Sequence, residues 1–178
     1  MQPTLDTARL RLRAFTTADA ADVQRLAGDF RVAEFATAIP HPYPDGAAEQ
    51  WIAGHAGAFR ERTEVVYAIT QQGGGALLGA ISLLDVQMPH ARAELGYWIA
   101  VDHWGQGYCS EAAGRLIAYA HEELGISRVV ARCLARNPAS ARVMEKAGLS
   151  REGVLPLHVR KAGRYEDMLL YGVVLAGR

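Results

Sequence analysis

Hydrophobic positions recur along the chain at two periods, and their succession predicts a protein that mixes strands with helices. Residues 9–15 alternate between apolar and arginine positions, with Leu10 and Leu12 on one side, as in a half-buried strand. Further strands are expected at residues 65–70, 77–84, 92–101, 128–134, 149–159 and 167–175. Helical spacing is expected between Thr16 and Gly28, and over residues 30–38, 47–62, 112–124 and 139–147.

The order of these elements is β-α-α-α-β-β-β-α-β-α-β-β. The consecutive strands within residues 65–101 favour an antiparallel meander, and the strand–helix–strand stretch over residues 92–134 favours a parallel crossover. We therefore expect an α+β fold, an α/β sandwich whose mixed, mostly antiparallel, twisted sheet carries helices on both faces. No repeat or linker divides the sequence, and residues 1–178 are interpreted as one domain.

Composition narrows the class of partner. The formal net charge is zero, so no global field points to nucleic acid or to an anionic membrane, whereas self-association into a homodimer stays open. The two cysteines, Cys109 and Cys133, are too few for a disulfide framework, and neither they nor the six histidines show ligand spacing, so no metal is expected. Without an apolar leader or a long apolar run, we expect a cytoplasmic protein.

A glycine-bearing turn at residues 104–111 separates an expected strand from an expected helix. Backbone N–H groups in such a turn can converge on an anion, and the start of the helix adds its partial positive charge. The turn lacks the Gly-Lys-Ser/Thr of a P-loop, and Ser110 stands at the third glycine position of a dinucleotide fingerprint. Turn chemistry alone leaves anion binding and a simple tight turn equally open.

Several motifs in a fixed order make nearly the whole chain resemble the GNAT superfamily of acetyl-CoA-dependent N-acetyltransferases. Within it, the chain is most similar to the branch that contains the ribosomal-protein alanine N-acetyltransferases. The motifs are Leu-Arg-Leu-Arg at 10–13, Glu-Leu-Gly-Tyr-Trp-Ile at 94–99, Trp-Gly-Gln-Gly-Tyr-Cys-Ser-Glu-Ala at 104–112 and Asn-Pro-Ala-Ser-Ala-Arg-Val-Met-Glu-Lys-Ala-Gly-Leu at 137–149. The resemblance implies acetyl-CoA as cofactor, CoA as product and direct attack by an amine in a ternary complex.

The resemblance also implies a set of cofactor-binding residues. In such proteins the glycine turn presents backbone N–H groups to the pyrophosphate, a strand N–H holds the acetyl carbonyl, and an asparagine contacts the pantetheine chain. The residues implied here are Ile99, Trp104, Gln106, Gly107, Tyr108, Cys109, Ser110, Asn137 and, as a nearby cation, Arg142. Cys109 departs slightly from the family pattern, and a small residue in a crowded turn explains it better than a nucleophile at a helix start does.

Two residues are expected to carry the chemistry. An amine is mostly protonated at neutral pH and needs a base, and the resemblance makes Glu94 that base, acting through water. A glutamate merely paired with Arg92 or Arg13 is an equal alternative. Many members place a tyrosine where this chain has Met144, so the branch pattern makes Ser140 the donor to the leaving thiolate.

The acceptor pocket is expected to use Phe35, Tyr43, Trp98, Tyr165 and Asp167. By resemblance, the acceptor is a primary amine at a protein or peptide N-terminus. A small-molecule amine such as a polyamine, an amino acid or an antibiotic is the alternative. A non-catalytic CoA-binding module on the same fold is a less favoured hypothesis.

Overall fold

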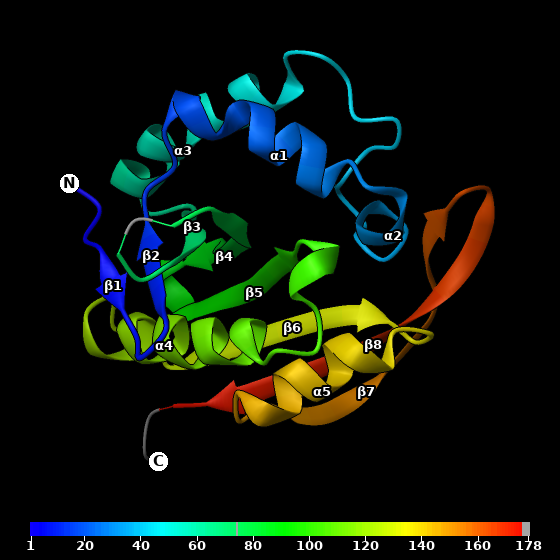
Figure 1. Cartoon of the computed structure of the whole chain (residues 1–178). Coiled ribbons are helices and arrows are strands. Elements are labelled where there is room, and N and C mark those ends of the chain that lie inside the picture. Colours follow the sequence, from blue (N-terminus) through cyan, green and yellow to red (C-terminus); the bar gives the residue numbers. More distant parts are fainter. Residues whose placement is uncertain (74, 176–178) are drawn as a thin grey trace.

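An eight-stranded sheet runs through the protein, whose computed structural model describes residues 1–73 and 75–175 (Figure 1). The strands are β1 Leu5–Asp6, β2 Leu10–Arg13, β3 Val65–Gln71, β4 Leu77–Gln87, β5 Arg92–Ile99, β6 Arg128–Leu134, β7 Ser150–Lys161 and β8 Arg164–Val174. The α-helices are α1 Ala20–Ala27, α2 Phe30–Ala33, α3 Ala47–Glu61, α4 Tyr108–Glu122 and α5 Pro138–Lys146. Short 3-10 helices cover Thr17–Asp19, Met88–His90 and Val101–His103.

The sheet is mixed, and its order is β1-β2-β3-β4-β5-β6-β8-β7. Neighbouring strands from β1 to β5 are antiparallel, β5 and β6 are parallel, and β6, β8 and β7 are again antiparallel. The predicted meander, the crossover through α4 and the final hairpin are therefore confirmed. The two-residue strand β1 is an addition that the sequence pattern does not reveal, because it is too short to show a period.

Helices cover both faces of the sheet, as expected (Figure 1). The apolar side of α4, with Leu116 and Ile117, packs in one cluster with the inward-facing residues of the central strands, including Leu83 and Leu95. Helices α1 and α3 form a second cluster on the other face, which includes Val23 and Ile52. Burying one aliphatic side chain completely stabilises the fold by roughly 1.5–3 kcal/mol, so these two clusters determine where each helix packs on the sheet. Among the described helices, none combines the length and apolar character that crossing a membrane requires.

Several boundaries differ from the sequence expectation: β4 runs to Gln87 and β8 begins at Arg164, and the largest differences in the helices are at α2 and α4. Helix α2 covers Phe30–Ala33 and not residues 30–38; in the loop that follows it, the carbonyl groups of Ala36 and Ile39 accept hydrogen bonds from Lys161 on β7. Helix α4 begins at Tyr108, four residues early, since a left-handed glycine precedes it. The cap residue of α3 is Gly46, while the neighbouring Asp45 accepts a hydrogen bond from Gln24 at 2.7 Å.

The imidazole of His55 on α3 is buried without a hydrogen-bond partner among the described residues. Its ring packs against Trp51, with 4.4 Å between ring centroids, and against Phe15 at 5.5 Å. Burial lowers the pKa of His55 from 6.5 to about 4, because the apolar surroundings disfavour the charged form. The side chain is therefore neutral in the folded protein at neutral pH.

We predict that the free energy of unfolding falls as the pH drops from about 6.5 to about 4, because the unfolded chain then binds a proton that the folded chain does not. The interval between these two pKa values corresponds to roughly 3 kcal/mol. Replacement His55→Leu should remove this contribution in urea unfolding curves recorded across the interval. His90 is exposed, so His90→Leu should leave the dependence of the free energy of unfolding on pH unchanged. The prediction would be contradicted if His55→Leu also left this pH dependence unchanged.

Candidate active site

The parallel pairing of β5 and β6 ends at Leu95 and Ala131, and beyond this point the two strands diverge (Figure 1). On its other side β5 stays paired with β4 as far as Ile99, and the next N–H, of Ala100, donates to Leu78 at 2.8 Å. Backbone N–H groups alternate in direction along an antiparallel strand, so those of Tyr97 and Ile99 point away from β4. The divergence thus opens a gap in the sheet that has main-chain donors on one side.

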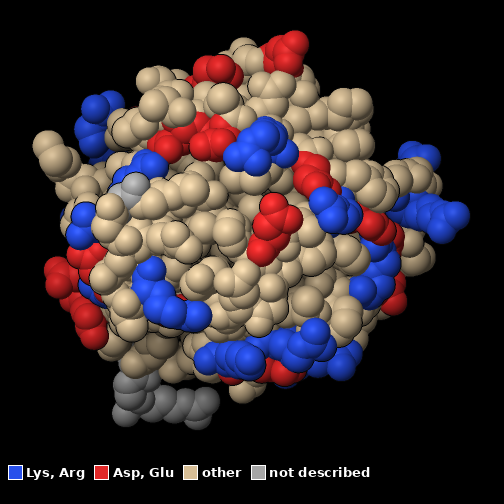
Figure 2. Space-filling model, in the orientation of Figure 1, with Lys and Arg blue, Asp and Glu red and all other residues tan. Residues whose placement is uncertain are grey.

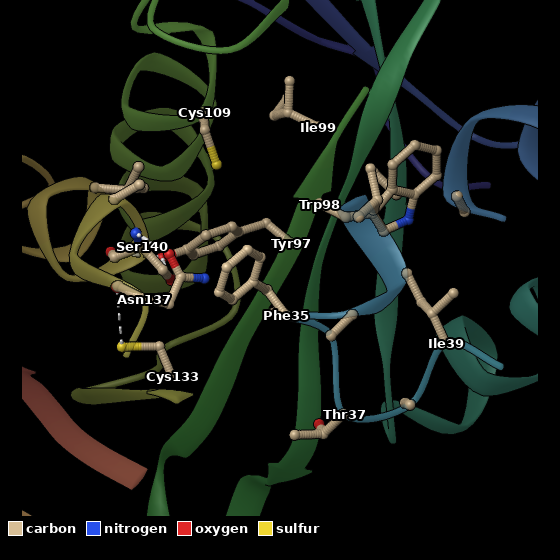
Figure 3. A pocket seen from close by; sticks show the side chains of 18 of the residues that line it. Phe35, Thr37, Ile39, Tyr97, Trp98, Ile99, Cys109, Cys133, Asn137 and Ser140 are labelled. Carbon is tan, nitrogen blue, oxygen red and sulfur yellow. Dashed lines mark hydrogen bonds between the residues drawn. The ribbon is translucent and has the colours of Figure 1, made fainter. Parts of the chain in front are cut away.

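A cavity of about 1110 Å³ follows this gap (Figure 3). Residues of α1, α2, the loop after α2, β4, β5, the glycine turn, β6 and α5 line it. In Figure 3, Ser140, Asn137 and Cys109 lie on one side of Tyr97, while Phe35 and Ile39 lie on the other. The expected residues Glu94, Ser140, Ile99, Trp104, Gly107, Tyr108, Cys109, Ser110, Asn137, Arg142, Phe35, Tyr43 and Trp98 all line this cavity.

The glycine turn forms a cradle of backbone N–H groups at one end of the cavity. Gly105 and Gly107 have left-handed φ angles of 73° and 80°, which only glycine adopts without strain. Gly107 is the cap residue of α4, and no side chain of the described residues caps this end of the helix. The N–H groups of the first turn, which begins at Tyr108, lack partners within the helix and are free to bind an anion.

Arg9 holds this turn in place, a role that the sequence pattern does not reveal. Its guanidinium donates to the carbonyl of Gln106 at 3.0 Å and to the carboxylate of Glu111 at 2.7 Å, and it lies 4.6 Å from the ring centre of Tyr108. Thr7 donates to the same carboxylate at 2.6 Å. Burial alone would raise the pKa of Glu111, but the hydrogen bonds from Thr7 and Arg9 outweigh it and lower that pKa. Periodicity shows Arg9 only as an outward-facing strand residue.

Ser140 lies at the start of α5, where two groups fix its position. The Asn137 side chain caps the helix by accepting from the Ser140 N–H at 3.1 Å. The hydroxyl of Tyr97 lies 2.8 Å from Ser140 Oγ and 3.0 Å from the Ser140 carbonyl oxygen, and its single proton can be donated to either of these two acceptors. Burial raises the pKa of Tyr97, so the phenol stays protonated. The Tyr97 contact was missed from the sequence, although this residue stands in the motif that includes Glu94.

Glu94 forms an ion pair with Arg132, and the expected alternatives Arg92 and Arg13 are wrong. Two nitrogens of Arg132 donate to the two carboxylate oxygens at 3.0 and 2.6 Å. A third nitrogen of Arg132 lies 3.1 Å from Nε2 of His158. The parallel register brings β6 beside Glu94, whereas Arg92 contacts Asp85 and Arg13 contacts Asp19.

Three expected residues do not line the cavity. Tyr165 is 65% exposed and stacks near Arg160, and the Asp167 carboxylate accepts from the N–H of Leu157 at 2.8 Å. The neighbouring Met168 lines the cavity instead, because successive residues of β8 face opposite ways. The third is Gln106, whose side-chain amide donates a hydrogen bond to the carbonyl of Asp102 at 3.1 Å.

The thiol of Cys109 lines the cavity among apolar neighbours. Burial raises the pKa of this thiol well above its usual range, so it stays protonated at neutral pH. A reactive cysteine needs the opposite shift. The structure therefore agrees with the interpretation of Cys109 as a small residue in a crowded turn.

Comparisons with known proteins agree with this geometry. A family model described as an acetyltransferase (GNAT) domain matches residues 9–150. An uncharacterized N-acetyltransferase, YoaA of Bacillus subtilis, is 30% identical over 98% of each chain. The ribosomal-protein-serine acetyltransferase of Escherichia coli is 32% identical over 56% of this chain and 55% of its own, and the spermidine N(1)-acetyltransferase of Vibrio cholerae is 27% identical over 52% and 53%.

A solved structure extends the likeness to the whole fold. The ribosomal L7/L12 alpha-N-protein acetyltransferase RimL in complex with coenzyme A superposes with a TM-score of 0.89 over 97% of this chain and 98% of that chain, at 19% identity. The residues of the present cavity fit that cofactor, because the uncapped start of α4 offers N–H groups for a pyrophosphate and the gap offers strand N–H groups for a carbonyl.

We predict that Gly107→Ala weakens binding of coenzyme A about tenfold in calorimetry, because alanine disfavours the left-handed φ of 80° at this position and its Cβ would lie 3.5 Å from the Arg9 guanidinium that holds the turn. Gly125→Ala is the matched control, since Gly125 lies beyond the other end of α4 with a similarly left-handed φ of 71°. Both variants should lose comparable thermal stability, and only Gly107→Ala should lose affinity. If the two variants bind coenzyme A with equal affinity, the prediction that the glycine turn binds the phosphates is wrong.

Proposed function

Because the chain belongs to the GNAT family of N-acetyltransferases, and acetyl-CoA is therefore its acetyl donor, we propose that it acetylates the primary amine of a protein or peptide N-terminus. The observation that carries the proposal is the gap between β5 and β6, with the α4 cradle at one end and Glu94 beside the other. The cavity volume of about 1110 Å³ exceeds the usual roughly 300–1,000 Å³ of a ligand pocket, which leaves room for an acceptor.

The donor side uses backbone groups for binding. The first-turn N–H groups of α4 hold the pyrophosphate, and Arg142 on α5 is close enough to the cavity to meet a phosphate. The Ile99 N–H holds the acetyl carbonyl and stabilises the charge that develops on its oxygen. Trp104 keeps this strand end in place by donating to the Ile99 carbonyl at 2.8 Å. The bound cofactor supplies an activated acetyl thioester.

Glu94 takes up the proton of the acceptor ammonium through a water molecule in this proposal. The two hydrogen bonds from Arg132 hold the Glu94 carboxylate in place beside the gap. They leave other lone pairs of the carboxylate available, since an ionised carboxylate accepts about four hydrogen bonds. The ion pair therefore positions the base beside the gap and leaves it able to accept a proton through water.

Ser140 protonates the leaving thiolate, and Tyr97 positions it. When the Tyr97 hydroxyl donates to Ser140 Oγ, the serine proton is free to point into the cavity. A thiolate is already a good leaving group, so the gain from this acid is modest. The high pKa of Tyr97 suits a hydroxyl that donates and does not ionise.

A small-molecule amine is the second candidate acceptor. Lys161 and Arg136 tie the loop after α2 to the β7–β8 hairpin, through the carbonyls of Ala36 and Glu34. This contact holds in place the loop after α2, which lines the cavity, and we expect a fixed wall to suit a slender acceptor better than a folded one. The likeness to a spermidine acetyltransferase supports the same alternative.

The decisive experiment is thiol release from acetyl-CoA across N-terminal peptides, polyamines, amino acids and aminoglycosides. We expect the peptides to give the highest kcat/KM. A preference for polyamines would favour the second candidate. CoA binding without turnover on any amine would mean a non-catalytic module and would overturn the proposal.

On the preferred acceptor, Glu94→Gln should lower kcat roughly a hundredfold, a usual effect of losing a general base, with little change in CoA affinity. Arg132→Gln is the informative partner, because it removes the ion pair and leaves the Glu94 carboxylate present. If Glu94 serves only to pair with Arg132, the two variants should behave alike; if it is the base, only Glu94→Gln loses turnover.

Ser140→Ala should lower kcat about tenfold without raising the KM for acetyl-CoA. General acids typically contribute more than about tenfold when the leaving group is poor, but a thiolate is a good leaving group and gains less from an acid. Ser140→Thr keeps the hydroxyl and should restore most of the rate. The Asn137 cap uses the backbone N–H of residue 140, so helix α5 survives both changes. Equal rates for the serine and alanine enzymes would exclude the acid role.

A further inference from the structure

One face of the central strands forms the floor of the cavity on the acceptor side. Ser82 on β4 pairs with Gly96 on β5, and Leu84 pairs with Glu94. A Cβ on Gly96 would lie 3.0 Å from Leu84 Cδ1 and 3.1 Å from Ser82 Oγ, so these two side chains already cover the glycine. The side chains of Ser82 and Leu84 therefore cover the backbone of this part of the sheet, and charged side chains lie at its edges.

Glu64 stands at the edge of this floor farthest from the gap. It directly precedes β3, where Val66 pairs with Ser82, and alternation places Glu64 on the same face as Val66. Glu64, Val66 and Ser82 all line the cavity. Glu64 and Glu94 are two strand spacings apart, so about 10 Å separates their backbones.

Free charge is unevenly distributed along the cavity. Within residues 1–73 and 75–175, Glu64 makes no ion pair and its carboxylate accepts no hydrogen bond, whereas Glu94 is neutralised by Arg132 and Glu34 by Arg136. At the opposite end, Arg142 and Lys146 line the cavity without an ion pair among the described residues, and Figure 2 shows basic side chains gathered over α5. The cavity therefore presents free cations where the cofactor phosphates bind and a free anion where the acceptor enters.

We propose that Glu64 binds a second positively charged group of the acceptor, so that the preferred substrate is a primary amine carrying another cation roughly 10 Å away. The inference rests on the proposed function and names the chemistry of its acceptor. Glu64 is too far from the gap to act on the reacting nitrogen. It is a specificity residue that orients the acceptor across the Ser82–Gly96 floor, with the reacting amine toward Glu94.

The test compares matched acceptors that differ by one charge. The pairs are heptylamine with 1,7-diaminoheptane, and the peptide Ser-Gln-Ala-amide with Ser-Lys-Ala-amide. The enzyme should favour the dicationic member of at least one pair about tenfold, through a lower KM at similar kcat. Glu64→Gln should abolish that preference and leave the monocationic acceptor unchanged, while Glu64→Asp should retain part of it.

Glu61→Gln is the matched control, because Glu61 is an exposed glutamate at the end of α3 that does not line this cavity. If the Glu64-dependent preference occurs in the diamine pair, the acceptor is a small amine. If it occurs in the peptide pair, the acceptor is a peptide N-terminus followed by a basic residue. No charge preference, or one that survives in Glu64→Gln, would overturn the inference. If no amine is acetylated, calorimetric binding of the same pairs to the CoA-loaded protein gives the same comparison, so failure of the proposed function remains distinguishable.

Discussion

The end of hydrogen bonding between β5 and β6 is the constraint on which the rest of the site depends. A central strand that loses its neighbour leaves backbone N–H and C=O groups unpaired, and such groups must find partners or cost free energy. Trp104 satisfies the Ile99 carbonyl, and the N–H groups of Tyr97 and Ile99 remain for a ligand. The carbonyl of a thioester is a partner of the right size and polarity for these donors. The break in the sheet thus offers two strand N–H groups to the carbonyl of a ligand.

The parallel relation of β5 and β6 also explains where the anion cradle lies. Parallel strands need a crossover connection, and here the crossover is α4. The chain leaves β5 at the divergent end of the pair, so the first turn of α4 starts beside the gap. The positive end of the helix dipole and the strand donors therefore serve the same cavity, and Arg9 fixes the turn between them. The parallel connection of β5 to β6 through α4 thus brings both the strand N–H groups and the start of α4 to the cavity.

Much of this could be predicted from the sequence, and the failures have a common cause. Periodicity predicted the long strands and helices, and the two glycines at residues 105 and 107 predicted the turn before α4, because these signals are local. The partner of Glu94 was mispredicted because Arg132 is 38 residues away and only the parallel register brings it near. Tyr165 and Asp167 were placed in the pocket because one residue of strand register decides which face a side chain takes. The role of Arg9 was missed for the same reason as Arg132: its partners are distant in the sequence.

Ion pairing around the cavity then determines which charges remain to recognise a substrate. Arg136 binds Glu34 and Glu166, and Lys161 binds two loop carbonyls, so these cations are used to hold the loop after α2 against the β7–β8 hairpin. Burial, together with the nearby Arg136, lowers the pKa of Lys161, because both disfavour its charged form. Among the described residues that line the acceptor side of the cavity, Glu64 at the start of β3 is the carboxylate that makes no ion pair. A cationic acceptor would meet attraction there without repulsion from an unpaired guanidinium.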